Sequence, residues 1–419
     1  FAAEFSCERE RAQKPCMPLR PLLLNFSAEV PRKLAEQVRL KPASGEAIAP
    51  FFAPDDREAE VSQLRFKAPL PESTAFTLVL PKALRDVDGR ELANAGSFPL
   101  KVATAEMPPL AKFAAAPFGV VELLGEPGQP PLVPLTVRHV ERQLQVKGSG
   151  ALGVKSQTVS ADRGDREILQ WMAKVQRHHE SSFSARELGR PKAEWLAWVT
   201  ETDDDGQPKR VQRERRIGSR ELSLLDGVKA SQTLTVPSAD AQDPRPFEVV
   251  GIPLSGPGYH VVEVSSPRLG AALLAQPAPM YVRTGVLVSN LSVHAKLGRD
   301  NALVWVTSLD KGKPVRGAEV GVSDCTGTRL WSGRTDAQGL ARIEQRLVVR
   351  RDAQCLVSEG LFVTARHALD EAQSKGQFKG QTDLAFVFTD WQKGIEPWRF
   401  NHPTQSPGEE GVPVSVRAH

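Results

Sequence analysis

The sequence predicts an all-β chain of tandem immunoglobulin-like β-sandwich domains, one of which carries a short helical insertion. Short runs of alternating or β-branched apolar residues recur along the 419 residues, and turns rich in Gly, Pro and Asp separate them. The 33 prolines and 32 glycines supply these turns. An apolar content of 40% supports hydrophobic cores, and the length predicts roughly three domains.

Charge and hydropathy restrict the function classes. The 54 basic and 50 acidic side chains are interspersed, which argues against a nucleic-acid partner. No run of eighteen apolar residues is present, and the N-terminal FAAEFSCERE lacks the pattern of a signal peptide. We therefore expect any signal peptide or lipid anchor to lie outside this chain.

Residues 1–106 are predicted to form the first immunoglobulin-like sandwich. It should be incomplete at its N-terminus, because FAAEFSC begins in mid-strand. An Asp-Gly turn at residues 86–90 punctuates its later strands. The other expected strands are LLLNFSAEVP, VSQLRFKAPL, AFTLVLPKAL and SFPLKV.

The composition changes at Met107-Pro108-Pro109, and residues 107–279 are predicted to form a second sandwich. A helical insertion is expected near residues 165–180, where apolar residues recur at helical spacing behind an acidic first turn. These apolar residues are Ile168, Met172 and Val175. Expected strands are GVVELL, PLTVRHV, AEWLAWVT, PFEVVGIPL and YHVVEVSS.

Residues 280–392 are predicted to form a third sandwich, and residues 393–419 a linker and the start of a following domain. Strands are expected at 303–309, 318–322, 329–331 and 340–343. Alternation places Trp305 on one strand face and Val304 and Val306 on the other. We expect Trp305 in the core, opposite Val320, Val322, Ala341 and Ile343, and the other tryptophans of this region, Trp331, Trp391 and Trp398, to be core residues as well.

The four cysteines form two local pairs, Cys7 with Cys16 and Cys325 with Cys355. No C-x-x-C and no zinc-finger histidine spacing accompanies them, so no metal site is expected. Two disulfides in an oxidising compartment are the favoured interpretation, and free thiols are the alternative.

No motif predicts an enzyme or a cofactor. Gly148 to Gly153 satisfy G-x-G-x-x-G without a following helix, and Asp203-Asp204-Asp205-Gly206 lacks the EF-hand spacing, so it reads as a solvated hairpin tip. His178 and His179 are adjacent on a helix and cannot easily share a metal, so surface histidines are expected there. We expect no catalytic residue, no metal, no cofactor and no small-molecule substrate.

The run WVTSLDKGKPVRGAEVGVSDCTGTRLWSGRTDAQGLARI, residues 305–343, resembles the macroglobulin-like domain of bacterial alpha-2-macroglobulins. The likeness covers residues 280–400 and extends more weakly to residues 246–264 and 108–123. It implies a scaffold fragment of an inhibitor that traps proteases in the periplasm or cell envelope. Proteases would then be partners through the full-length protein.

Many members of that family capture the protease covalently through a Cys-x-Glu-Gln thioester. None of the four cysteines here is followed by Glu-Gln at that spacing, so this chain cannot perform the covalent step. The alternative function is an envelope adhesion or protein-interaction module, because tandem immunoglobulin-like domains serve that purpose equally well.

Overall fold

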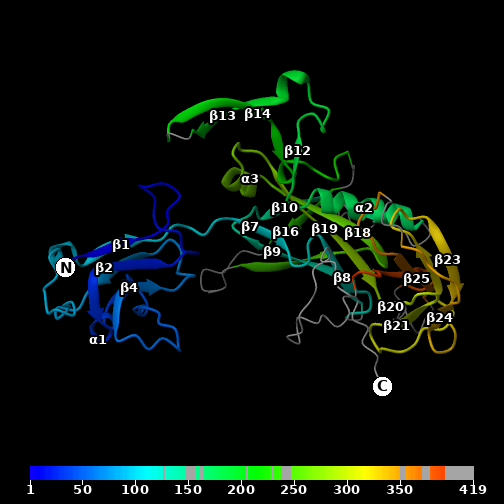
Figure 1. The fold of residues 1–419 in the computed structure, drawn as a ribbon, viewed down its shortest axis with the longest axis horizontal. Coiled ribbons are helices and arrows are strands. Elements are labelled where there is room, and N and C mark those ends of the chain that lie inside the picture. Colours follow the sequence, from blue (N-terminus) through cyan, green and yellow to red (C-terminus); the bar gives the residue numbers. More distant parts are fainter. Residues whose placement is uncertain are drawn as a thin grey trace, which may run out of the picture. The chain divides into compact units, whose positions relative to one another are not determined.

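The computed structural model describes residues 1–125, 128–147, 156–159, 164–203, 206–227, 231–236, 247–349, 354–369 and 378–391. The chain divides into two compact units, Phe1–Pro109 and Leu110–His419. Both units consist mainly of antiparallel strands, which confirms the all-β prediction (Figure 1).

Two three-stranded sheets enclose the core of the first unit, and all their strand pairs are antiparallel. Alternate residues of the longest strand, such as Leu22 and Leu24, point into this core, as a sandwich strand requires. The first sheet contains β1 (Ala3–Ser6), β2 (Leu22–Pro31) and β4 (Glu60–Phe66), and the second contains β3 (Arg39–Pro42), β5 (Ala75–Val79) and β6 (Leu100–Ala103). The helical pieces are α1 (Arg32–Ala35) and a 3₁₀ turn (Ala95–Ser97).

The second unit begins with a six-stranded sheet packed on a three-stranded sheet around one apolar core. The larger sheet has the order β16-β10-β18-β19-β8, and β11 also pairs with β18. Its strands are β8 (Phe118–Glu122), β10 (Gln143–Lys147), β11 (Ser156–Val159), β16 (Ser231–Thr235), β18 (Gly258–Ser266) and β19 (Met280–Ser289). The smaller sheet contains β7 (Leu110–Phe113), β9 (Leu132–Arg138) and β17 (Glu248–Pro253), and α3 (Pro267–Leu273) follows β18.

Residues 280–289 were expected to open the third sandwich, but the structure places them in this six-stranded sheet. As β19 they pair with β18 along their whole length and run parallel to β8. Val286 and Val288 point into the core of that sandwich. The chain therefore leaves this sheet only after Ser289.

The remaining strands form a three-stranded and a four-stranded sheet around a third core. The strands expected between residues 303 and 343 are all present, but they do not form one meander: the first and last of them pair in one sheet, and the middle two pair in the other. The first sheet contains β20 (Leu291–Leu297), β21 (Ala302–Ser308) and β24 (Leu340–Ile343). The second contains β22 (Glu319–Ser323), β23 (Arg329–Arg334), β25 (Phe362–Ala368) and β26 (Thr382–Phe388).

The prediction that Trp305 lies in the core is wrong. Trp305 is 41% exposed, whereas Val304 and Val306 on the opposite strand face are buried. The indole lies against His294 at 5.6 Å and donates to the Gln338 carbonyl at 3.2 Å. Val320, Val322, Ala341 and Ile343 are core residues, but they face the two valines. Trp391 is also exposed, Trp331 is half-buried, and Trp398 lies outside the described residues.

Gly339 ends the turn between β23 and β24, and its conformation explains the residue type. Its φ is +72°, and a Cβ atom would lie 2.5 Å from the Val306 carbonyl oxygen. Any side chain would therefore meet both backbone strain and a steric clash. This glycine lets the turn at residues 336–339 close onto β21.

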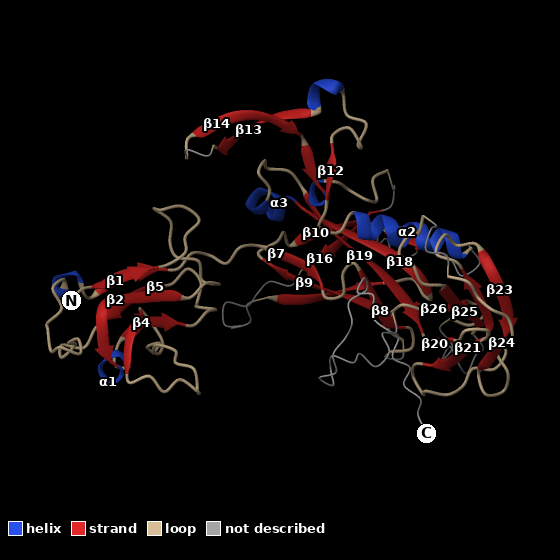
Figure 2. Cartoon of the chain, in the orientation of Figure 1, coloured by secondary structure: helices blue, strands red, loops and turns tan. Residues whose placement is uncertain are grey.

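A hairpin projects from the second unit between helix α2 (Asp165–Arg177) and β16 (Figure 2). Its root consists of β12 (Ser182–Ser184) paired with β15 (Arg216–Gly218), and its outer part of β13 (Leu196–Thr202) paired with β14 (Pro208–Glu214). Two 3₁₀ turns flank it, Lys192–Glu194 and Ser219–Glu221. We call β13 and β14 the arm. The expected strand AEWLAWVT therefore belongs to the arm and not to a sandwich sheet.

Candidate functional site: the joint beneath helix α2

Helix α2 (Asp165–Arg177) is the predicted helical insertion. Asp165 and Glu167 lie in its first turn, and Lys174 and Arg177 lie in its last turn, which complements the helix dipole. The expected apolar stripe is buried, with Ile168, Met172 and Val175 joined by Leu169. An amphipathic helix of this length requires a partner surface for its apolar face.

That partner surface comes from two sandwiches at once. The α2 stripe packs with Tyr259, Val261 and Leu287 of the six-stranded sheet. The same cluster contains aromatic and aliphatic residues of the four-stranded sheet, namely Phe362, Leu384, Phe386 and Phe388. The ribbon shows α2 lying alongside β18 (Figure 1). One hydrophobic core therefore belongs to both sandwiches, and we call this region the joint.

A buried carboxylate fixes the N-terminal end of α2 to the four-stranded sheet. Asp165 is nearly inaccessible, and its Oδ2 accepts hydrogen bonds from Ser323 at 2.6 Å and Arg329 at 2.8 Å. Its Oδ1 accepts from Arg366 at 2.8 Å and from Thr364. Charge-assisted bonds to two guanidinium groups hold the helix in one position relative to β22, β23 and β25.

A second buried ion pair fixes the C-terminal end of α2. The Arg283 Nε donates to Glu263 at 3.0 Å, and its terminal nitrogens donate to the carbonyls of His178 and Ser219 at 2.7 and 2.9 Å. Glu263 also accepts from the Leu224 amide at 2.7 Å. Burial lowers the pKa of Arg283, and the neighbouring Glu263 carboxylate opposes that change.

A third buried carboxylate lies where the chain passes from one sandwich into the next. Asp383 of β26 accepts hydrogen bonds from the Ser289 hydroxyl at 2.8 Å and the Asn290 amide at 2.9 Å. Its own sheet contributes the Leu384 amide at 2.8 Å. Burial raises the pKa of Asp383 to about 6 although these donors favour the charged form.

His260 of β18 is a buried titratable group near the same joint. A ring nitrogen, Nε2, lies 2.8 Å from the Gly256 carbonyl oxygen. Burial lowers the pKa of His260 to about 4, so the imidazole is neutral at physiological pH. Asp165, Glu263, Asp383 and His260 are buried, so their polar groups interact within the protein.

The structure brings the predicted cysteine pairs together. Cys7 is bonded to Cys16, with 5.7 Å between their Cα atoms, and Cys325 is bonded to Cys355, with 4.8 Å. The second disulfide ties the turn after β22 to the segment that precedes β25.

Other predicted sites show no ligand geometry. Gly148 to Gly153 lie outside the described residues, as do Asp204 and Asp205. Asp203 closes its turn by accepting from the Gln207 amide at 2.7 Å. His178 and His179 are half-buried, not surface-exposed, because His178 ends α2 and packs on Phe183 at 4.8 Å. Within the described ranges, no three His, Cys, Asp or Glu side chains gather as a metal site.

The joint was not recognised from the sequence, although a signal for it exists. Glu263, Arg283 and Asp383 each interrupt an apolar strand, in YHVVEVSS, MYVRTGVLV and TDLAFVF. A charge inside an apolar strand indicates a buried and partnered group. Which charges pair cannot be read from strand patterns, because the partners lie on different elements.

The fold defines a modular β-sandwich protein. Residues 288–407 match the family model described as the bacterial alpha-2-macroglobulin MG3 domain. This match confirms the resemblance to a bacterial alpha-2-macroglobulin domain that residues 305–343 indicated. No helix in the described part of the chain is both long and apolar enough to span a membrane.

Solved structures of the same family are similar to the chain at low identity. The Escherichia coli alpha-2-macroglobulin structure spanning domains MG0-NIE-MG1 is 14% identical, with a TM-score of 0.42 over 92% of this chain and 96% of that one. A Salmonella alpha-2-macroglobulin mutant is 15% identical, with a TM-score of 0.44 over 98% of this chain. The chain spans 19% of that Salmonella protein. A search of curated proteins finds no match.

Proposed function

We propose that this chain is a scaffold section of a bacterial alpha-2-macroglobulin-like inhibitor that traps proteases in the cell envelope. It would contribute three sandwiches, residues 1–106, 107–279 and 280–392, and a following linker at 393–419. The observation that carries the proposal is the joint, where one core and the Asp165 network connect two sandwiches and the Glu263–Arg283 pair fixes the C-terminal end of α2.

The physical argument concerns stiffness. A trap must keep the geometry of its walls while other parts move, and domains joined only by a linker move relative to one another by default. At the joint, relative motion would separate Asp165 from Arg329 and Arg366 and would expose aromatic side chains. Each of these changes is costly, so two packed sandwiches behave as one body. Proteases would bind the whole protein, and this section supplies neither a catalytic group nor a thioester.

The test uses the full-length protein that carries this chain. Asp165→Lys places a third cation beside Arg329 and Arg366 and should loosen the joint, and Asp165→Asn gives a milder version of the same change. Glu201→Lys is the matched control, because Glu201 pairs with Arg213 on the exposed arm. The measurement is protection of a large protein substrate from an added protease that still cleaves a small peptide.

We expect protection to fall for both Asp165 variants and to stay unchanged for Glu201→Lys. Folding of each variant is checked by circular dichroism and thermal melting. Full protection by a folded Asp165→Lys protein would show that stiffness at the joint is not needed for trapping.

An interaction module in the envelope is the second candidate function. One observation favours it, namely the arm, whose side chains contact solvent on both faces. The two functions differ in what the isolated chain does, since a module binds its partner alone whereas a scaffold section does not inhibit proteases alone.

A further inference from the structure

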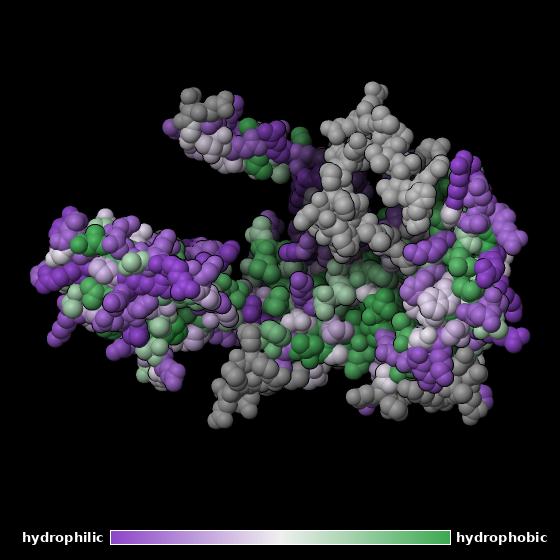
Figure 3. Space-filling view, turned by 60° about the horizontal axis from the view of Figure 1, so that its bottom comes forward, coloured by the Kyte–Doolittle hydropathy of each residue, from purple (hydrophilic) through white to green (hydrophobic). Residues whose placement is uncertain are grey.

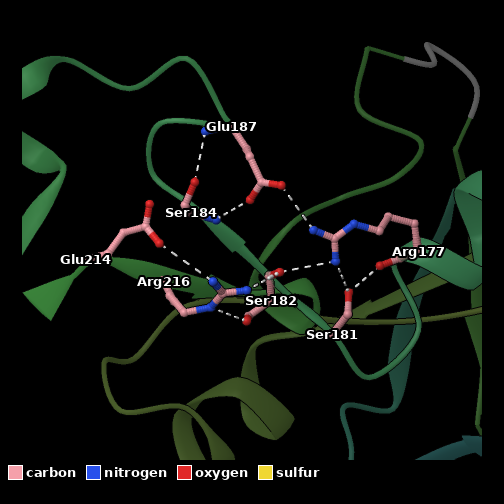
Figure 4. Close-up of polar contacts among 7 residues, drawn as sticks. All are labelled: Arg177, Ser181, Ser182, Ser184, Glu187, Glu214 and Arg216. Carbon is pink, nitrogen blue, oxygen red and sulfur yellow. Dashed lines mark hydrogen bonds and ion pairs between the residues drawn. The ribbon is translucent and has the colours of Figure 1, made fainter.

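The arm is fixed firmly at its root (Figure 4). Arg177 at the end of α2 donates to the Ser181 hydroxyl and the Ser182 carbonyl and pairs with Glu187 at 3.3 Å. Glu187 and Ser184 bond reciprocally through side chain and backbone, at 2.6 and 3.1 Å. The direction of the arm is therefore set by helix α2.

The opposite strand of the root is fixed by the same serine. Arg216 of β15 donates to the Ser182 hydroxyl at 2.8 Å and to the Ser182 carbonyl at 3.1 Å, and it lies 3.7 Å from Glu214 (Figure 4). Trp195 lies just beyond the root, where its indole donates to the Arg190 carbonyl at 2.8 Å. Both strands thus leave the joint from a pre-organised base.

The outer part of the arm carries apolar side chains that pack against no core. Trp198 is 60% exposed and Leu196 is 53% exposed, and Val199 on the other face is also exposed. The surface of the arm mixes apolar green with polar purple in the space-filling view (Figure 3). A hairpin of two strands is marginally stable alone in water, so exposure of this kind favours a binding partner.

The hydrogen-bonding edges of the arm are open within the described ranges. There, β13 pairs only with β14, and no third strand joins either of them. An edge strand presents a row of unpaired amide and carbonyl groups that another extended chain can use.

Charge identifies the kind of chain that fits the β14 edge. Residues 208–216 contain five basic side chains and one acidic side chain. Three of the cations have acidic partners, namely Arg213 with Glu201, Arg215 with Glu194 and Arg216 with Glu214. Lys209 and Arg210 have none in the described part of the chain, and Arg210 instead lies over the Trp198 ring at 5.5 Å. A second copy of β14 on this edge would bring like charges together.

We propose that the arm binds an extended acidic peptide segment by strand addition to the edge of β14. Lys209 and Arg210 are successive strand residues and therefore point to opposite faces. A segment with carboxylates on both faces can pair with each of them, while backbone hydrogen bonds run along the edge. Trp198 and Arg210 provide an amphipathic surface for its remaining side chains. This inference goes beyond the scaffold role and does not depend on it.

The test measures binding of a fluorescein-labelled Glu-Thr peptide to the full chain by fluorescence anisotropy at low salt. The peptide is built of repeated Glu-Glu-Thr-Thr units, which place carboxylates on both faces of an extended strand. A Lys-Thr peptide of the same length is the charge control. A Glu-Thr peptide methylated on every backbone nitrogen has no N–H donor on either edge, so it cannot form a strand ladder and is the geometry control. We expect only the unmethylated acidic peptide to bind, and we expect its affinity to fall with added salt.

Charge-reversal variants test whether the peptide binds at Lys209 and Arg210. Lys209→Glu combined with Arg210→Glu should lower the affinity for the acidic peptide at least tenfold and should allow the Lys-Thr peptide to bind. Lys41→Glu combined with Lys101→Glu, on strands of the first unit, makes the same change in net charge and should have no effect. Unchanged circular dichroism shows that the variants are folded.

Three results would overturn the proposal. If the methylated peptide bound as tightly as the unmethylated one, the arm would attract acidic peptides by charge alone and not by strand addition. The arm would instead be a membrane-surface site if the chain bound no acidic peptide but bound vesicles of anionic lipid, and if Lys209→Glu combined with Arg210→Glu abolished the vesicle binding. No binding of any probe would mean that the cations only protect an edge strand from aggregation.

Discussion

Glu263 and Arg283 lie directly opposite each other on β18 and β19, and both side chains of this ion pair are buried. Each of them also binds backbone groups that follow α2, so the pair connects the sheet with the segment at residues 219–225. Cross-strand ion pairs usually lie on the protein surface, whereas this pair lies in the interior and holds the segment after α2 against the sheet.

Removal of one partner should therefore lower the stability of the fold strongly. Arg283→Met leaves the Glu263 carboxylate buried without its cation and should lower the free energy of unfolding by about 3 to 5 kcal/mol. Urea unfolding monitored by circular dichroism measures this change. Arg213→Met, which breaks the exposed pair with Glu201, is the control and should change little. Equal effects of the two substitutions would contradict the structural role of the buried pair.

The two valines, and not Trp305, should support the third sandwich. Val306→Ala opens a cavity between the two sheets and should cost roughly 2 kcal/mol. Trp305→Ala removes a partly exposed side chain that lies outside the core and should cost clearly less. Thermal unfolding of both variants gives the comparison, and a larger loss for Trp305→Ala would place the indole in the core after all.

Two buried groups should give the second unit opposing responses to pH. The pKa of Asp383 is raised from its ordinary value to about 6, so its contribution to stability is full below pH 4 and is lost as the pH rises through 6. The pKa of His260 is lowered to about 4, so its contribution is present above pH 6.5 and is lost as the pH falls through 4. Each contribution is about 3 kcal/mol, and between pH 4 and 6 they largely cancel.

Single substitutions should uncover each response. Relative to the parent chain, His260→Gln should make the free energy of unfolding fall between pH 4 and 6, because Asp383 then acts alone. Asp383→Asn should make it rise over the same interval. Urea titrations at several pH values measure both slopes, and slopes of equal sign would contradict the assignment.

Both disulfides should be detected by mass spectrometry of peptides from the non-reduced protein. The bond between Cys325 and Cys355 closes a 30-residue separation and should stabilise the fold by roughly 3 to 4 kcal/mol, whereas the bond between Cys7 and Cys16, with a separation of 9, should contribute less. Free thiols at all four positions would contradict this prediction and would weaken the proposed location in the envelope.

Local patterns were sufficient for the strands and turns, but they could not decide between faces. Alternation and turn residues predicted β21 to β24 and helix α2 to within three residues at each end. Both faces of β21 carry large apolar side chains, so the buried face depends on which sheet stacks on it, and the wrong face was chosen for Trp305. The arm was missed because LAWVTET has the composition of a core strand. Its exposure follows from the absence of a covering sheet in the described structure, which no local pattern reports.

The joint also has a consequence for synthesis on the ribosome. Arg366 lies 201 residues after Asp165, and Phe386 and Phe388, which belong to the same core cluster as the α2 stripe, follow still later. At a bacterial elongation rate near the upper end of 5 to 20 residues per second, the helix waits on the order of 10 s for these partners. During that interval its apolar stripe is available to chaperones or to other nascent chains. The first unit has all its own core residues by then, so the chain should mature in two stages separated by this delay.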